Sequence, residues 1–183
     1  LRTRLVVERL TNQQQEEPFT NDAMAWGVEH EDEARIAYEM TAGVNVQESG
    51  FLSHNELLAG CSLDGHIGAY DGHPTYEGIV EIKCPFMTAR HVTTLRGGIP
   101  SDYLPQITHN LWITEAAWCD YVSYDPRLPE ALRLSVHRVQ ASSLKLADYD
   151  KAVRAFLKEV DAEYQALLTL ANPVAVLAEV VPG

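Results

Sequence analysis

Residues 78–83 read Gly78-Ile79-Val80-Glu81-Ile82-Lys83, an apolar run that ends with a glutamate and a lysine one residue apart. A short apolar run of this kind is typical of a buried β-strand. Because successive side chains of a strand point to opposite faces, we expect Glu81 and Lys83 on one face and Ile82 in the core. Upstream, Asp64 lies in the turn-forming stretch Ser62-Leu63-Asp64-Gly65. A hairpin between the two strands would bring Asp64 to the same site.

Two carboxylates beside a lysine suit a divalent metal ion. Mg²⁺, for which Mn²⁺ can substitute, prefers oxygen ligands and keeps several waters, so Asp64, Glu81 and the backbone carbonyl of Ile82 would suffice on the protein side. Such an ion activates a bound water and neutralises charge in phosphoryl transfer, while Lys83 can orient the nucleophile or stabilise developing negative charge. The alternative is a solvent-facing ion pair on an edge strand, which is the commoner meaning of an isolated Glu-x-Lys pattern.

Four motifs stand in one order along the chain. They are Trp26-Gly27-Val28-Glu29-His30-Glu31, Gly60-Cys61-Ser62-Leu63-Asp64-Gly65, Glu81-Ile82-Lys83-Cys84-Pro85-Phe86 and Tyr103-Leu104-Pro105-Gln106. From about Ala25 to Arg127 this order resembles the lambda exonuclease (YqaJ-type) viral recombinase family, a branch of the PD-(D/E)xK nuclease superfamily. The resemblance implies a restriction-endonuclease-like core and a Mg²⁺-dependent 5′-to-3′ exonuclease. Such an enzyme digests one strand of linear duplex DNA and leaves a 3′ overhang for a single-strand annealing protein.

The resemblance also assigns roles to individual residues. The catalytic residues that it implies are Glu31, Asp64, Glu81, Lys83 and Gln106, with Glu31 added to the metal ligands. Leu63 stands where the family has proline in its turn, and Thr108 stands where the family has a second glutamine. Without the motif, Glu31 would be interpreted as part of the solvated charge run 29–33 at the start of a helix.

The formal net charge of −12 is unfavourable for binding a duplex, because phosphate binding is driven by basic residues. A bound metal offsets part of this charge, and only a local basic track must face the DNA. Arg90 and Arg96 are the expected phosphate contacts. The other basic residues considered for the track are His91, Arg127, Arg133, Arg138, Lys145 and Arg154. Family members form ring-shaped homotrimers, and a ring would gather such residues around one channel, so we expect a homotrimer.

The 183 residues, 46% of them hydrophobic and 22% charged, are expected to form a single α/β (α+β) nuclease domain. We expect an N-terminal helix and loop over 1–20, a catalytic core with a central mixed β-sheet flanked by helices over 21–140, and a C-terminal helix and tail over 141–183. Expected strands are 44–54, 57–62, 66–70, 75–83, 118–124 and 132–139. Expected helices are 22–41, 88–96, 103–114 and one from 142 or 143 to 170. The metal site is expected at one edge of the sheet.

The sequence contains no apolar run of about 18 residues and no secretory leader, so we expect a cytoplasmic protein, encoded by a phage or prophage, without membrane contact. Cys61, Cys84 and Cys119 are expected to be buried hydrophobic residues. Because the first motif begins early for this family, we also expect that an N-terminal segment is missing. Two other functions stay open. One is an endonuclease of the same superfamily, such as a restriction or junction-resolving enzyme, and the other is a non-catalytic interaction module.

Overall fold

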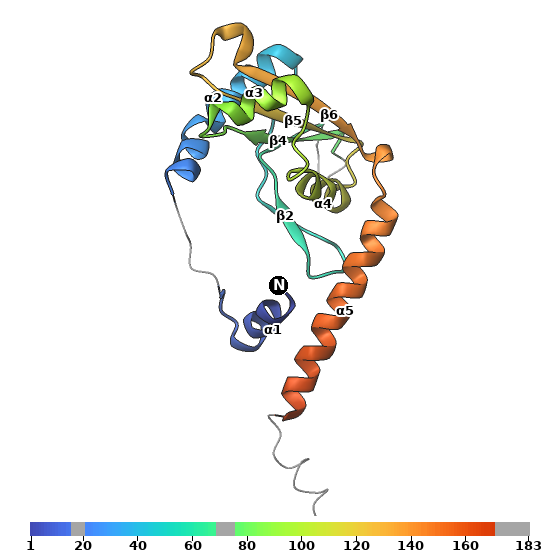
Figure 1. Ribbon diagram of the computed structural model, residues 1–183. Helices are drawn as coiled ribbons and strands as arrows, with labels where there is room; N and C mark the ends of the chain where they lie inside the picture. Colours follow the sequence, from blue (N-terminus) through green and yellow to red (C-terminus); the bar gives the residue numbers. More distant parts are fainter. Residues whose placement is uncertain (16–20, 69–75, 171–183) are drawn as a thin grey trace, which may run out of the picture. The chain divides into compact units, whose positions relative to one another are not determined.

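The computed structural model describes residues 1–15, 21–68 and 76–170 (Figure 1). These residues belong to two compact units. Helices α1 (Arg2–Thr11) and α5 (Leu146–Leu170) form one unit, and the elements from α2 to β6 form the other. The single domain expected over 1–183 stays a prediction. The expected turn at residues 71–72, the adjoining strand ends and part of the loop before residue 21 lie outside the described residues.

A four-stranded mixed sheet forms the centre of the larger unit (Figure 1). Its strands lie in the order β3 (Gly65–Ile67), β4 (Gly78–Lys83), β5 (Trp118–Tyr124) and β6 (Leu134–Gln140). The outer pairs are antiparallel and the central β4–β5 pair is parallel. A parallel pair needs a crossover connection, which here contains α3 (Thr88–Gly97) and α4 (Leu104–Thr114). Strands β1 (Phe51–Ser53) and β2 (Gly60–Ser62) form a separate antiparallel pair. The expected mixed α/β fold is confirmed.

Alternation along β4 and β5 divides the hydrophobic core into two layers. One layer contains Val80, Ile82 and Val122, together with Ala34 and Tyr38 of helix α2 (Asp22–Ala42). The other contains Ile79, Cys119 and Tyr121, together with Ile107 and Leu111 of α4. Glu81 is two residues from Ile79, so its side chain lies on the α4 face of the sheet. The expected burial of the three cysteines is confirmed, and all three are free thiols.

Helix α2 begins and ends where its capping residues predict. The Asn21 side chain accepts a hydrogen bond from the backbone N–H of Met24, and Gly43 ends the helix in the left-handed conformation, with φ 68°. The helix is fastened to the sheet by the buried Asp120 of β5. Its Oδ2 accepts a hydrogen bond of 2.6 Å from the Tyr38 hydroxyl, and both its oxygens accept 2.7 Å bonds from Arg138 of β6.

Two expectations about the sheet were wrong. The strand expected over 44–54 is limited to β1, with one isolated bridge between Gln47 and His66. The Val46 N–H instead donates to the Glu39 carboxylate of α2 at 2.6 Å. This backbone N–H is therefore bonded to a side chain and not to a neighbouring strand. The site also does not lie at a sheet edge, because β4 is an inner strand. Strand β5 was predicted with its observed bounds, whereas β6 begins at Leu134 after a 3₁₀ turn.

The unit formed by α1 and α5 contains two buried apolar residues and several ion pairs. Val6 of α1 and Val160 of α5 are fully buried. Arg2 pairs with Glu159 and Glu163, and Arg9 pairs with Asp161. Across the described parts of the chain, no helix combines the length and the apolar character needed to cross a membrane.

Candidate active site

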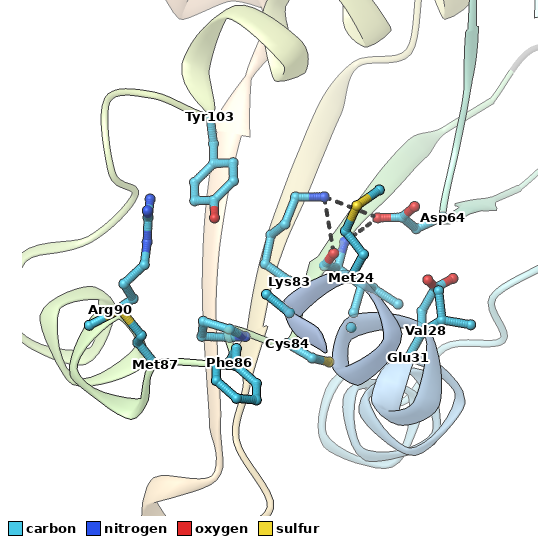
Figure 2. A pocket seen from close by; sticks show the side chains of 14 residues that line it. Met24, Val28, Glu31, Asp64, Lys83, Cys84, Phe86, Met87, Arg90 and Tyr103 are labelled. Carbon is cyan, nitrogen blue, oxygen red and sulfur yellow. Dashed lines mark hydrogen bonds and ion pairs between the residues drawn. The ribbon is translucent and has the colours of Figure 1, made fainter. Parts of the chain in front are cut away.

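A cleft of about 620 Å³ opens beside the end of β4 (Figure 2). Its lining comes from α2, the turn before β3, the end of β4 with the residues that follow it, and the starts of α3 and α4. The polar side chains in this lining are Glu31, Asp64, Lys83, Arg90 and Tyr103. In Figure 2, Asp64 and Glu31 lie on one side of the cleft, Arg90 and Tyr103 lie on the other, and Lys83 extends between them.

Asp64 lies directly before β3, which pairs antiparallel with β4. Its Oδ2 accepts a 2.7 Å hydrogen bond from the backbone N–H of Ile82, which ties the turn to the strand that carries Glu81. The preceding Leu63 is buried, so packing holds the turn in the absence of the family's proline. Position 65 has room only for glycine, because a Cβ there would lie 2.2 Å from the Cγ1 of Val46.

Glu81 is fully buried, and both its carboxylate oxygens have partners. Oε1 accepts a hydrogen bond from the Lys83 ammonium, and Oε2 accepts a 3.0 Å hydrogen bond from the Asn110 amide of α4. Burial raises the pKa of Glu81 to about 7; Asp64 and Glu31 contribute in the same direction, and Lys83 opposes them. A solvent-facing ion pair on an edge strand is therefore excluded, because a buried carboxylate on an inner strand needs these partners.

The Lys83 ammonium lies among the oxygens expected to bind a metal. Besides Glu81, its Nζ contacts the Ile82 carbonyl at 3.2 Å and Asp64 Oδ2 at 3.8 Å. Burial lowers the pKa of Lys83, but the carboxylates of Glu81 and Asp64 outweigh it and the net shift is upward, so the amine remains charged. One cation therefore already lies within reach of both carboxylates and the carbonyl.

Glu31 faces the cleft from α2 but stands apart from this group. Its Oε1 pairs with the Arg35 guanidinium at 3.2 Å, and burial together with the Asp64 carboxylate raises its pKa against the effect of Arg35. Over residues 1–15, 21–68 and 76–170, no three His, Cys, Asp or Glu side chains lie close enough to hold one metal ion. Direct protein ligands would thus be two carboxylates and a carbonyl, which agrees with an ion that keeps several waters.

The remaining predicted residues divide between the cleft and the surface. Arg90 lines the cleft and pairs with Asp102. Gln106 and Arg96 are exposed and are not part of the cleft lining. Asn110, one helical turn after Gln106, contacts Glu81 instead and was not identified from the sequence. Its spacing of four residues from Gln106 on a predicted helix is a signal that could have suggested it.

Three basic residues considered for the DNA track have structural roles. His91 is fully buried and hydrogen-bonded to Ser123 and to the Leu132 carbonyl. Arg138 binds Asp120 as described above. Arg127 binds the buried Asp125 and donates to the carbonyls of Pro85 and Phe86, at 3.1 Å and 3.0 Å. Arg127 therefore holds the segment that leaves β4 after Lys83.

Tyr103, which begins the fourth motif of the sequence, is brought to the cleft by the structure. Its ring lies between two cations, 5.8 Å from Lys83 Nζ and 5.6 Å from Arg90 Cζ, measured to the ring centroid. Figure 2 shows the Tyr103 ring and hydroxyl between Arg90 and Lys83. A phenol in this position can donate a hydrogen bond to an anion bound between the two basic side chains.

This chain is similar to known proteins in sequence and in fold. The model of the YqaJ-like viral recombinase domain matches residues 2–117. An alkaline exonuclease (LHK-Exo) from Laribacter hongkongensis is 34% identical, with a TM-score of 0.81, over 94% of this chain and 84% of that chain. The structure of LHK-Exo in complex with dAMP gives the same values. A phage related exonuclease from Haemophilus somnus 129PT is 15% identical, with a TM-score of 0.60 over 93% and 82% of the two chains, and shows a likeness of fold alone. No curated protein matches the chain.

Proposed function

This chain belongs to the YqaJ-like viral recombinase family and is a DNA exonuclease, and from that premise we propose that it digests linear duplex DNA from a 5′ end with the help of Mg²⁺. The digested strand would leave a 3′ overhang for a single-strand annealing protein. The observation that carries the proposal is that oxygens of Asp64, Glu81 and the Ile82 carbonyl lie together around the Lys83 ammonium.

The residues around that position fit a hard divalent ion. Two carboxylates and one backbone carbonyl supply oxygen ligands, and the incomplete protein shell leaves positions for water and phosphate. When bound, Mg²⁺ or Mn²⁺ lowers the pKa of a bound water and offsets negative charge on the reacting phosphate. Asp64 and Glu81 would hold the ion together with the Ile82 carbonyl, and Glu31 faces the same cleft.

Lys83 performs the other part of the chemistry. Its ammonium is charged and lies at the cleft, so it donates to an oxygen of the scissile phosphate and stabilises the charge that develops there. Because that interaction strengthens in the transition state, replacement of Lys83 by alanine should lower kcat by a factor on the order of 100 with little change in KM.

DNA contacts are proposed on the basic side of the cleft. Arg90 and Tyr103 face the cleft and suit a backbone phosphate, and exposed Arg96 lies farther along α3. The binding of dAMP by the related LHK-Exo supports a cleft that accepts a single nucleotide. A homotrimeric ring would retain DNA despite the acidic charge of each chain, because release would require threading of the strand. Light scattering tests the trimer, and a monomer that degrades long duplexes without release would contradict the ring.

Digestion of linear duplexes labelled at either the 5′ or the 3′ end, with and without Mg²⁺, tests the activity. We expect Mg²⁺-dependent release of the 5′ label first and no cleavage of closed circular DNA. Asp64→Asn and Glu81→Gln should each abolish cleavage, because each removes a charged ligand while keeping its shape. Glu29→Gln, which removes an exposed carboxylate from the same helix as Glu31, is the matched control. Cleavage of closed circles would favour an endonuclease, and inactivity on every substrate would favour an interaction module.

A further inference from the structure

Helix α4 carries a polar side chain on its buried face. Asn110 is 3% exposed and lies between the fully buried Ile107 and Leu111. Burial of an amide is unfavourable unless it is hydrogen-bonded, and Asn110 Nδ2 donates to Glu81 Oε2 at 3.0 Å. The hydrogen bond to Glu81 therefore explains why an asparagine occupies this core position.

The bond divides the two oxygens of Glu81 between two partners. Oε2 is directed toward α4 by Asn110, which leaves Oε1 bound to Lys83, whose side chain lines the cleft. We propose that Asn110 is a positioning residue that fixes the Glu81 carboxylate in the orientation required to bind the metal ion. This inference rests on the proposed function, because it takes Glu81 to be a metal ligand.

Helix α4 is a rigid support for this role. Its Ile107 and Leu111 pack in the same core layer as Ile79, two residues before Glu81. Partners that orient a ligand in this way commonly change metal affinity by about 10- to 100-fold when they are removed.

Metal binding by the DNA-free protein provides the test. Mn²⁺ affinity is measured by calorimetric titration for the wild type, Asn110→Leu and Asn110→Ser. Leucine keeps the branched shape and the number of side-chain heavy atoms and removes the donor, and serine is smaller than the native residue and too short to reach Glu81. We expect both variants to bind Mn²⁺ about 10- to 100-fold more weakly, with a matching rise in the Mg²⁺ concentration that gives half-maximal cleavage and no change in KM for DNA.

Thr114→Val is the matched control, because it removes the buried hydrogen bond from the Thr114 hydroxyl to the Asn110 backbone carbonyl and leaves the Asn110 side-chain amide and Glu81 in place. It should lower the melting temperature and leave Mn²⁺ affinity unchanged. Equal losses of Mn²⁺ affinity in Thr114→Val and Asn110→Leu would overturn the positioning role, as would wild-type affinity in either Asn110 variant. Glu81→Gln in the same titration separates the two levels of inference. If Glu81→Gln binds Mn²⁺ normally, the proposed metal site is wrong, whereas a loss in Glu81→Gln alone refutes only the role of Asn110.

Discussion

Replacement of Asp102 by asparagine should strengthen DNA binding. Asp102 is exposed and pairs with Arg90, the guanidinium that faces the cleft beside Tyr103. A DNA phosphate at this side of the cleft would have to displace the Asp102 carboxylate from Arg90. Asparagine keeps the size of the side chain and removes the competing charge, so it leaves Arg90 available to the phosphate.

The size of the effect follows from the exposure of the pair. The side chains of Arg90 and Asp102 are 48% and 59% exposed, and exposed ion pairs contribute about 0.2–1 kcal/mol. Release of this competition corresponds to a decrease in Kd by a factor of about 1.4 to 5. Fluorescence anisotropy of a labelled duplex in Ca²⁺, at several salt concentrations, measures it. The gain should shrink as salt increases, because exposed charges are screened.

Two further variants test whether the gain comes from the loss of competition for Arg90 or only from the loss of one negative charge. Glu130→Gln removes an exposed carboxylate elsewhere in the same unit and should have a smaller effect. Arg90→Ala should weaken binding, and Asp102→Asn added to Arg90→Ala should produce no further gain beyond that of Glu130→Gln. A gain from Asp102→Asn that persists in full without Arg90 would refute the competition.

Two further predictions concern stability. Burial would raise the pKa of Asp125, but hydrogen bonds from Arg127 outweigh burial and lower that pKa to about 2. Because this is below the unfolded value of about 3.9, the ionised form contributes about 2 kcal/mol above pH 4. That contribution is lost as the pH falls from about 4 to about 2. Urea unfolding at several pH values should therefore show a weaker acid dependence in Asp125→Asn, and an unchanged dependence would refute the assignment. Tyr38→Phe removes the bond to the Asp120 carboxylate, which should cost about 2 kcal/mol and lower Tm by about 4–8 °C; a scan that shows no shift would mean that the bond contributes nothing.

The sequence predicted the central strands well because their signals are local. The run from Trp118 to Tyr124 is buried along its whole length, and its bounds follow from composition alone. The two-residue period likewise places Glu81 and Lys83 on one face and Ile82 in the core. The helix that bears Glu31 could be predicted from its caps, since Asn21 and Gly43 determine the backbone at its ends.

The partners of the site could not be predicted in the same way, because they are distant in sequence. Asn110 lies 29 residues from Glu81, and its spacing of four residues from Gln106 on the predicted helix does not by itself show that it contacts Glu81. Arg127 was considered for DNA binding on charge alone, but Asp125 turns it inward toward the segment that follows β4. Similarly, Glu39 takes the N–H of Val46, which a strand pattern assigns to a neighbouring strand.

Strand β4 serves the core and the site with alternate residues, and this constrains how the family can vary in length. Insertion or deletion of one residue between Gly78 and Lys83 would exchange the two faces of the rest of the strand. Glu81 would enter the apolar layer beneath α2, and Ile82 would take its place opposite α4. Core and site would fail together, with no intermediate state for selection to improve. Relatives that keep the activity should therefore differ along these six residues by substitution only, and accommodate changes in length elsewhere.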